Sequence, residues 1–321
     1  MSNSPNASPA SAPTPPAQIL TSGLTPSQKY GTLGGFTGHR MIPPPGKTTI
    51  LCLSLAGHGK TSFWASHPGA YIFNLDLSSF SAYDPPAMFW PALDPLGRGA
   101  LNDAGNPFVL EYKPVRERID LLKKMATDNS PRPETIVIDT LTSLFRMILA
   151  DRLKAAGMTS IRQVHGPTYY DEIYTEIANI IVDLRAHGYG VCLNAHLKEV
   201  EVTVGESAVE RQVRMAMTDN FFGRLSDIWE SVIIIEARKK SVLTPDPRFP
   251  DDRRRDIRSE VPVHYLTFNH PNLTKQMKTR LRFNIPEIEI PLGMGWETFA
   301  AQYMLAANAA LTPSLHPPRR A

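Results

Sequence analysis

The sequence lacks both a long hydrophobic run and a strong excess of charge of either sign. No apolar stretch approaches the ~18 residues that a membrane-spanning helix needs, and the N-terminus has neither the positive start nor the apolar centre of a signal peptide. The 321 residues include 34 lysines and arginines against 31 aspartates and glutamates, a net charge of +3. This balance excludes a global basic field that would attract nucleic acid. We expect no membrane partner.

Cysteine is scarce as well. The two cysteines, Cys52 and Cys192, lie within the apolar runs ILCLSL and YGVCLNA. A thiol in such a run usually behaves as a small buried hydrophobe. The sequence therefore predicts two reduced, buried cysteines, which is typical of a cytoplasmic protein.

Charge is missing from the first 28 residues, which are rich in serine, proline and alanine. Such a composition cannot bury enough apolar surface to offset the entropy lost on ordering. We predict a disordered arm at 1–28 and a second disordered tail at 312–321. The remaining residues, 29–311, contain no internal repeat and are long enough for one large domain.

Between the tails, short apolar runs alternate with helical patterns. The runs are TILCLSL, AYIFNLD, FVLEY, ETIVID, YGVCLNAHL and SVIIIEA. Apolar stripes of helical spacing follow ETIVID and precede YGVCLNA. Strands separated by helices predict an α/β fold with a mostly parallel central sheet flanked by helices.

The pattern changes after the fifth run. The stretch KEVEVTVGESAVERQVRM alternates apolar and polar residues around Gly205, which indicates a hairpin or a flexible loop. Prolines and mixed charge at 241–260 predict an exposed insertion. The run VPVHYLTFNH then predicts a strand and GWETFAAQYMLAANAAL a closing helix, so this late portion is β-rich.

The stretch PPPGKTTILCLSLAGHGKTSF contains two Gly-Lys-Thr copies, at 46–48 and 59–61. A phosphate-binding loop requires a strand before the glycines and a helix directly after them. The first copy follows three prolines and leads into a strand, so it does not meet this requirement. The second follows ILCLSL and leads into TSFWAS. It matches the pattern G-x-x-x-x-G-K-[ST], except that Ser54 stands at the first glycine.

We assign the phosphate-loop roles to this second copy. Gly57 and Gly59 let the backbone approach the phosphates, Lys60 reaches the β and γ oxygens, and the Thr61 hydroxyl binds magnesium. The remaining nucleotide-binding residues of the segment are His58 and Ser62. The simpler alternative is a glycine-rich surface turn with a solvated lysine. The strand before and the helix after it favour the phosphate loop.

A second sign is PETIVIDTLTSLF, in which a β-branched run ends on Asp139 before a helical stripe. Ligands bind at the carboxyl ends of strands in open α/β sheets. Asp139 can therefore hold Mg²⁺ opposite Thr61. The alternative is an aspartate that caps the following helix.

Five segments in order, AGHGKTS, IVIDTLTSLF, CLNAHLKEV, KTRLRF and LGMGWETF, resemble RecA-like nucleotide-binding ATPases of bacteriophages, including single-strand annealing proteins of the Sak type. The resemblance covers roughly Lys47 to Met304, and its first two motifs are specific in combination. It implies a RecA-like P-loop core that binds ATP and Mg²⁺, forms homo-oligomeric rings or filaments, and acts on single-stranded DNA. A single-strand binding protein is a further implied partner, and the host cytoplasm the location.

The resemblance also implies roles for residues outside the first two motifs. His196, at the end of YGVCLNAH, matches a polar sensor of the γ-phosphate, although a capping or surface histidine beside Lys198 is an alternative. Lys278 and Arg280 match a basic motif that reaches the phosphates of a neighbouring subunit's nucleotide. A solvated strand edge explains these two nearly as well.

One carboxylate that the family leads us to expect is missing. RecA-like ATPases usually orient the attacking water with a carboxylate after the second core strand, often in an Asp-x-Glu pair. Here the segment is NLDLSS, with Asp76 present and Ser78 in place of the glutamate. Either Asp76 takes that role, or Glu134 or another group does, or hydrolysis is slow.

Aromatic residues are few near the basic clusters. In the loop after the sensor strand, which faces DNA in RecA-like proteins, Lys198, Arg211 and Arg214 are offset by four glutamates. A stronger cluster combines 238–240, which includes Lys239 and Lys240, with 253–255 and Arg258. Its stacking candidates are Phe249 and Tyr265. Either cluster can contact DNA, and a solvated face is the alternative.

Three functions remain open. The ordered motifs favour an ATPase linked to single-stranded DNA in phage recombination, annealing or repair. The missing glutamate leaves room for a non-hydrolysing nucleotide switch or assembly protein. A P-loop phosphotransferase would need a substrate lid and an acceptor site, and neither is visible in the sequence.

Overall fold

A computed structural model describes most of the chain between residues 42 and 311. The described residues are 42–77, 86–93, 100–163, 166–204, 208–215, 225, 228–245, 247–248, 257–268, 281, 283–291 and 295–311. The chain divides into two compact units, Met1–Ile42 and Pro43–Ala321, and every element below belongs to the second. The predicted arm at 1–28 and the tail at 312–321 lie outside the described residues.

The second unit is built on a sheet with the strand order β11-β10-β9-β1-β7-β6-β2-β3, in which β8 also pairs with β7. From β9 to β3 all neighbours run parallel, whereas β8, β10 and β11 pair antiparallel. The strands are β1 Thr49–Ser54, β2 Ala70–Asn74, β3 Met88–Trp90, β6 Thr135–Asp139, β7 Gly190–Val204, β8 Ala208–Met215, β9 Ser231–Thr244, β10 Ile257–Phe268 and β11 Ile288–Ile290. A separate small hairpin joins β4 Ala92–Leu93 to β5 Ala100–Leu101. The predicted α/β fold, with a parallel core and a late β-rich portion, is confirmed.

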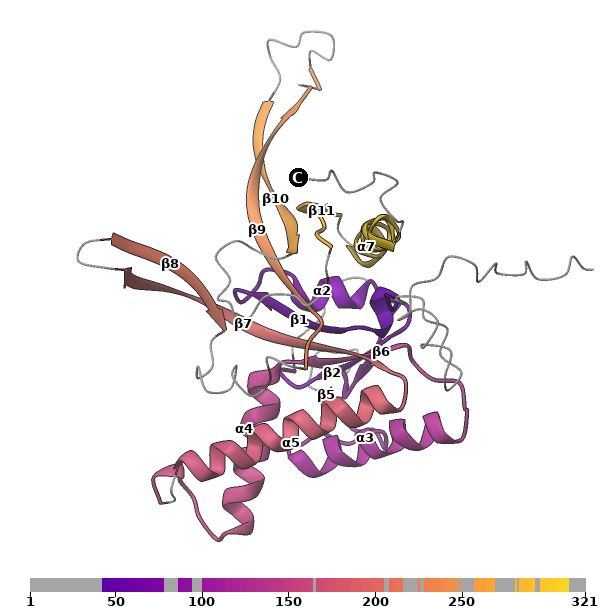
Figure 1. Ribbon diagram of the computed structural model, residues 1–321, viewed down its shortest axis with the longest axis vertical. Helices are drawn as coiled ribbons and strands as arrows, with labels where there is room; N and C mark the ends of the chain where they lie inside the picture. The colour runs from indigo at the N-terminus through magenta and orange to yellow at the C-terminus, as the bar shows by residue number, and fades with distance from the viewer. Residues whose placement is uncertain are drawn as a thin grey trace, which may run out of the picture. The chain divides into compact units, whose positions relative to one another are not determined.

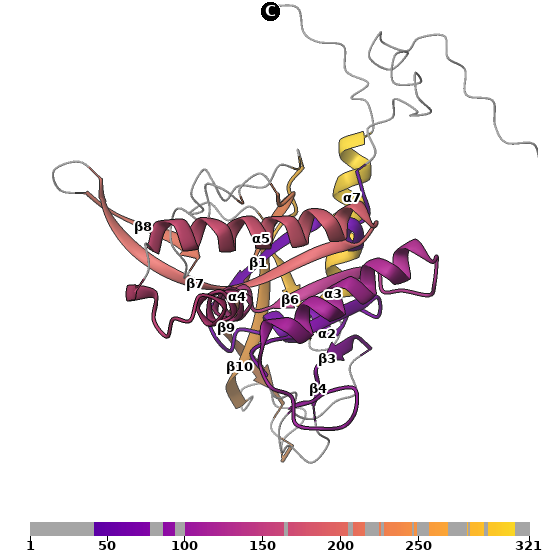
Figure 2. The ribbon, with the colours of Figure 1, turned by 90° about the horizontal axis from the view of Figure 1, so that it is seen from below.

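Helices cover both faces of the sheet. They are α2 Lys60–Ala65, α3 Tyr112–Thr127, α4 Leu141–Ala155, α5 Gly166–Ala186 and α7 Gly295–Leu311, with 3₁₀ turns η1 at Pro45–Lys47 and η2 at Ile161–Gln163. The group α3, α4 and α5 packs together on one face, and α2 with α7 lies on the other (Figures 1 and 2). Among the described residues, no helix has the length and apolar character needed to cross a bilayer.

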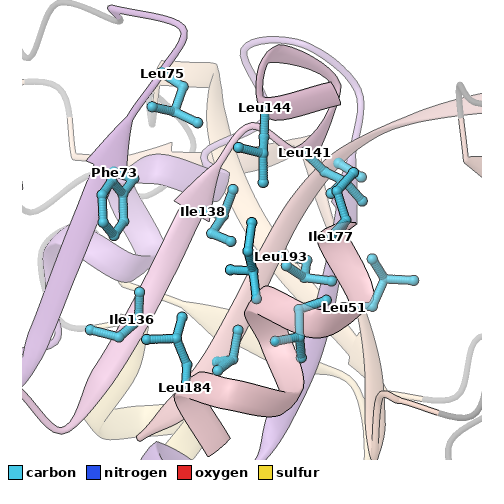
Figure 3. Packing of buried hydrophobic residues seen from close by; sticks show 14 of the residues in the cluster. Leu51, Phe73, Leu75, Ile136, Ile138, Leu141, Leu144, Ile177, Leu184 and Leu193 are labelled. Carbon is cyan, nitrogen blue, oxygen red and sulfur yellow. The ribbon is translucent and has the colours of Figure 1, made fainter. Parts of the chain in front are cut away.

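The core lies between the sheet and the α3–α5 layer (Figure 3). Alternate residues of β1, β6 and β7, among them Leu51, Ile138 and Leu193, point to this side and meet Leu144 and Ile177 from the helices. The intervening positions of the same strands face α2, because successive side chains of a strand point to opposite faces. Each parallel strand is therefore apolar on both sides, which is why its sequence reads as a continuous apolar run.

The two cysteines also belong to the buried interior. Cys52 on β1 and Cys192 on β7 have fully buried side chains and free thiols, as predicted. Burial raises the pKa of the Cys52 thiol to about 12. A thiol so far from ionisation is unreactive, which assigns Cys52 a packing role.

The predicted strand FVLEY is wrong. Residues 108–111 form no strand, and Tyr112 begins α3. Val109 is 64% exposed, so this apolar run does not enter the sheet. Pro114 lies in the first turn of α3, where a missing backbone donor does no harm, so proline there starts a helix instead of ending a strand.

Two strands continue far beyond the runs that predicted them. β7 extends to Val204 and pairs with β8, so the alternating stretch after the fifth run is a hairpin. β9 extends to Thr244 and pairs along its length with β10. Residues 241–244 and 257–260, which the sequence placed in an exposed insertion, are strand residues in the outer part of this hairpin. The polar residues at 238–241 interrupt the apolar run of β9, which conceals the rest of the strand in a hydrophobicity pattern.

A buried histidine ties the amino end of the sheet to α7. The His67 ring stacks on Trp296 at a centroid distance of 3.9 Å. Its Nδ1 accepts a hydrogen bond from the Gly69 backbone N–H at 3.2 Å, and its Nε2 lies 3.0 Å from the Thr135 hydroxyl, which itself donates to the Gly46 carbonyl. These partners require a neutral ring, and burial lowers the pKa of His67 to about 4.

Stability should therefore fall on mild acidification. The unfolded chain binds a proton at His67 near pH 6.5 and the folded chain only near pH 4, so folding weakens as the pH drops through this window. Between pH 7.5 and pH 5 we expect a loss of about 2 kcal/mol from this residue. Denaturant unfolding of wild type and His67→Asn across that range measures it. Equal pH slopes in the two proteins would refute the assignment.

Candidate functional site

The predicted phosphate loop joins β1 to α2. The strand ends at Ser54, five loop residues follow, and the helix begins at Lys60. Gly57 and Gly59 have φ angles of 78° and 89°, a region that favours glycine. A Cβ added at Gly59 would lie 2.9 Å from Cδ2 of His264, so a side chain is excluded there on a second ground. The order of strand, glycine turn and helix is the one that the sequence predicted.

Lys60 is held inside this loop. Its side chain is buried, and Nζ donates to Ser54 Oγ at 2.9 Å, to the Ser54 carbonyl at 3.1 Å and to the Leu55 carbonyl at 3.3 Å. Burial lowers the pKa of Lys60. Ser54, which stands where the motif usually has its first glycine, thus provides two of the acceptors that hold Lys60. An anionic phosphate can replace these neutral acceptors and would bind the ammonium more strongly than they do.

The other Gly-Lys-Thr copy lies at the opposite end of β1. Lys47 ends the 3₁₀ turn η1 that precedes the strand, and its Nζ donates to the Gly188 carbonyl at 2.9 Å. Gly188 lies two residues before β7, which runs parallel to β1. Lys47 therefore lies at the amino edge of the sheet and Lys60 at the carboxyl edge, where α/β sheets bind ligands.

Asp139 is the last residue of β6 and lies at that carboxyl edge. It is 1% exposed, and its Oδ2 has no hydrogen-bond partner. Burial raises the pKa of Asp139, and hydrogen bonding with Thr61 partly offsets the rise. Asn194 pairs with Asp139 in the β6–β7 register, and its buried Nδ2 also lacks a partner. Asn194 lies close enough to Asp139 to help lower its pKa, yet neither Oδ2 of Asp139 nor Nδ2 of Asn194 makes a hydrogen bond of good geometry.

These residues fit a magnesium ion. An unpaired buried carboxylate oxygen is costly, and a cation beside it would satisfy it. Mg²⁺ prefers hard oxygen ligands and is usually held by one or two carboxylates, waters and substrate phosphates. The Thr61 hydroxyl and the Asp139 carboxylate are such ligands. Within the described part of the chain no cluster of three or more His, Cys, Asp or Glu residues suits a metal, so an all-protein cage is not an alternative there.

Asp76 and His196 meet at the same edge. His196 is the last residue of β7 that pairs in parallel with β1. Its Nδ1 lies 3.5 Å from Lys60 Nζ and its Nε2 3.7 Å from Asp76 Oδ2. Asp76 Oδ1 accepts hydrogen bonds from the Thr140 hydroxyl at 3.0 Å and from the Ser143 hydroxyl. Although burial acts to raise it, hydrogen bonds from His196, Ser143 and Thr140 lower the pKa of Asp76. Asp76 is therefore ionised at neutral pH.

Four polar residues near the phosphate loop were not predicted from the sequence. Thr140 caps α4 and, with Ser143, positions Asp76. Both follow Asp139 within IVIDTLTSLF, so their place at a strand-to-helix junction was a usable signal. Asn194 is a polar residue inside an apolar strand, a pattern that could also have marked it as a site residue. His264 comes from a late strand, and nothing in its surrounding sequence links it to the loop.

Glu134, the alternative water-orienting carboxylate, is ruled out by its position. It directly precedes β6, at the amino end, and its Oε2 lies 3.9 Å from Nε2 of His67. The predicted Lys278 and Arg280 lie outside the described residues. So do Ser78, Phe249 and the arginines at 253–255.

The basic residues predicted to contact DNA are distributed over the two hairpins. Lys198 is exposed on β7, and Arg211 and Arg214 lie on β8. On the other hairpin Lys239 pairs with Glu260 at 3.0 Å, and Lys240 pairs with a β11 carboxylate. These surface ion pairs neutralise the local charge, although exposed pairs are weak and exchange partners readily.

The same hairpin contains the stacking candidate Tyr265. Arg238 lies over its ring at 4.9 Å and also bonds to Glu236 and Glu287. Hydrogen bonds to these carboxylates raise the pKa of Arg238 above its usual range. A base that stacked on this face of Tyr265 would have to displace Arg238, so the described part of this cluster is not preformed for stacking there.

The buried carboxylate of Asp139 should lower the stability of the ligand-free protein and at the same time allow it to bind Mg²⁺. At pH 8 the buried charge of Asp139 opposes folding, because its pKa is raised and the neutral form is favoured in the folded state. Asp139→Asn should therefore melt higher than wild type without nucleotide, by roughly 2–4 °C for about 1 kcal/mol. The variant should also lose the extra stabilisation that Mg²⁺ adds to ATP. Thermal unfolding with ATP, with and without Mg²⁺, tests both. A variant that melts lower without ligand would contradict this reading.

The profile of a protein family described as an AAA domain matches residues 47–274. The match includes Lys60, Asp76, Asp139 and His196. Among solved structures the chain is similar to the KaiC-like protein PH0186 from the hyperthermophilic archaeon Pyrococcus horikoshii OT3, with 12% sequence identity and a TM-score of 0.35 over 77% of this chain and 91% of that one. A comparison with curated proteins found no match.

Proposed function

From the premise that this chain belongs to the AAA-domain family of P-loop ATPases, we propose that it binds ATP with Mg²⁺, hydrolyses it, and acts on single-stranded DNA in recombination, annealing or repair. The observation that carries the nucleotide part is the meeting of Lys60, Thr61 and Asp139 at the carboxyl edge of one parallel sheet. Lys60 and Thr61 begin α2 and Asp139 ends β6, and the three have the chemistry that a triphosphate and its cation require.

Each side chain of the site has a distinct role in hydrolysis. Lys60 leaves the Ser54 and Leu55 carbonyls and binds the β and γ oxygens, where it neutralises charge as the terminal phosphoryl group departs. Thr61 and Asp139 hold the cation, which when bound supplies further positive charge against the phosphates. Water attacks the terminal phosphorus, and ADP and inorganic phosphate are the products.

Asp76 orients that water. Its Oδ1 is fixed by Thr140 and Ser143, while Oδ2 faces the His196 ring and can accept a proton from the attacking water. His196 lies between Asp76 and Lys60, so a γ-phosphate at Lys60 would contact its Nδ1. Presence or loss of that phosphate can therefore change the start of the β7–β8 hairpin.

The connection to DNA is supported by the placement of the two hairpins. β7 and β9 are the neighbours of β1 in the sheet, and both continue past its carboxyl edge into hairpins. Figure 1 shows the β7–β8 and β9–β10 hairpins extending from the sheet. Long arms that begin beside the phosphate loop could couple a bound polymer to the nucleotide. Side-by-side assembly into a ring or filament is part of the same proposal.

A non-hydrolysing switch is the second candidate. It is favoured by Ser78 in place of the expected glutamate, and by the two hydroxyl donors that already occupy Asp76 Oδ1. Such hydrogen bonds and a lowered pKa make Asp76 a weak base. Such a switch would bind ATP but would not hydrolyse it.

Phosphate release from ATP, measured with and without single-stranded DNA, separates the two candidates. The proposal predicts magnesium-dependent release that rises several-fold with single-stranded DNA and far less with an equal mass of duplex. The Lys60→Ala variant is the negative control and should release no phosphate above background. ATP binding without turnover under either condition would favour the switch, and turnover indifferent to DNA would refute the DNA role.

A further inference from the structure

A small pocket adjoins the phosphate loop on the side away from Asp139. It lies between the first turn of α2 and the late strands, and encloses only about 30 Å³. The side chains that line it include Ser62, Phe63, Ile235, His264, Ile290 and Pro291. A depression of this size can take the face or edge of a flat group without enclosing it. Most of its lining is apolar, so it suits a group with a weakly hydrated face.

The order of strands fixes which end of a nucleotide meets this pocket. Asp139 on β6 and His196 on β7 lie on one side of β1, and the lining strands β9, β10 and β11 lie on the other. The phosphate loop follows β1 and lies between the two groups. A triphosphate whose terminal phosphate faces Asp139 therefore directs its opposite end towards the pocket or into solvent.

We propose that this pocket is the base subsite, in which the base or ribose of the nucleotide rests against His264 and the neighbouring apolar side chains. The inference rests on the proposed function, because it presumes a triphosphate at Lys60. The proposal adds His264 as a positioning residue. This residue lies on β10, outside the phosphate-loop motif.

The position of His264 suits this role. Its ring lies against Gly59, close enough that a Cβ there would clash, so the ring borders the path from the phosphates to the pocket. It is half-buried, and burial together with the nearby His58 lowers the pKa of His264. His58 itself is anchored, since its Nδ1 accepts a hydrogen bond from the Ala237 backbone N–H at 3.2 Å. A neutral imidazole can stack on a base or bond to a ribose hydroxyl without repelling either.

Base selectivity should be weak at such a subsite. Phe63, Ile235, Ile290 and Pro291 offer no side-chain hydrogen bonds, so they can contact the face of a base but cannot read its edge. Strong discrimination requires polar groups that the wrong base leaves unpaired. We expect ATP and GTP to bind within about tenfold of each other, which is the range that apolar contacts supply.

Calorimetric titration with magnesium complexes of ATP and inorganic tripolyphosphate tests the proposal. The proteins are wild type, His264→Ala, Glu260→Ala and Lys60→Ala. Glu260 is the matched control, because it lies on the same strand and face as His264 but four residues further out. We expect His264→Ala to weaken ATP about tenfold, a loss of one stacking contact or hydrogen bond, and to leave tripolyphosphate unchanged.

The outcomes separate this proposal from the one on which it rests. Unchanged ATP affinity in His264→Ala, or an equal loss for both ligands, would overturn the base subsite while Lys60→Ala still supported the phosphate site. If wild type bound neither ligand, the nucleotide function itself would fail. Photolabelling of wild type with 8-azido-ATP needs no variant. Label in 257–268 or 288–291 supports the subsite, and label confined to the β7–β8 hairpin contradicts it.

Discussion

Replacement of Lys60 by alanine should weaken the binding of magnesium ATP by roughly 100-fold or more, the effect of removing a charge-assisted contact to two phosphates. The lysine is buried beside the loop carbonyls, so no other cation in the loop can take its place. The fold should survive, because the Ser54 hydroxyl still donates to the Leu55 carbonyl at 2.8 Å and Leu55 is exposed, so water can reach the loop. Titration calorimetry on the folded variant measures the loss.

The duplicated motif provides the matched control. Lys47→Ala removes the same side chain from an identical Gly-Lys-Thr triplet at the opposite end of β1, where the ammonium donates to the Gly188 carbonyl. Its ATP affinity should equal that of wild type within about twofold. An equal loss from both variants would show that the phosphate site had been assigned to the wrong end of the sheet.

Asp76→Asn should slow hydrolysis by roughly 10²–10³-fold with ATP affinity nearly unchanged, as expected for loss of a general base. Asparagine keeps the size of the side chain and an oxygen that can accept the Thr140 and Ser143 hydrogen bonds. It cannot accept a proton from water. Single-turnover phosphate release, combined with calorimetry, separates the chemical step from binding.

Glu134→Gln is the control for this experiment. Glu134 is the other carboxylate that the sequence allowed for this role, and it lies at the amino edge beside His67. Its variant should hydrolyse ATP at the wild-type rate. Full activity in Asp76→Asn, or a large loss in Glu134→Gln, would transfer the water-orienting role away from Asp76.

The choice between the two lysines shows what local sequence can determine. Three prolines before Gly46 exclude a central strand there, whereas ILCLSL before the second copy is a buried strand, so the order of elements alone identified Lys60. Asp139 could be predicted from local sequence as well, because a β-branched run that ends on an aspartate before a helical stripe marks the carboxyl end of a parallel strand. Their meeting with Thr61 follows from the parallel topology.

Contacts between distant segments could not be read in the same way. The neutral His264 approaches Gly59 only because β10 folds back beside β9, and no local pattern encodes that pairing. The strand predicted at FVLEY failed because periodicity cannot distinguish a buried run from one left on the surface, where Val109 lies. The alternating stretch at 198–215 allowed a hairpin, which β7 and β8 confirm. The length of the β9–β10 hairpin was missed, because a polar stretch at 238–241 follows the apolar run SVIIIEA.

The most direct test of the account is a crystal structure of the protein with Mg²⁺ and a non-hydrolysable ATP analogue. We predict that the γ-phosphate lies at Lys60 and His196, the metal between Thr61 and Asp139, and the base against His264. A nucleotide bound at the amino edge beside Lys47, or a metal that does not contact Asp139, would contradict it.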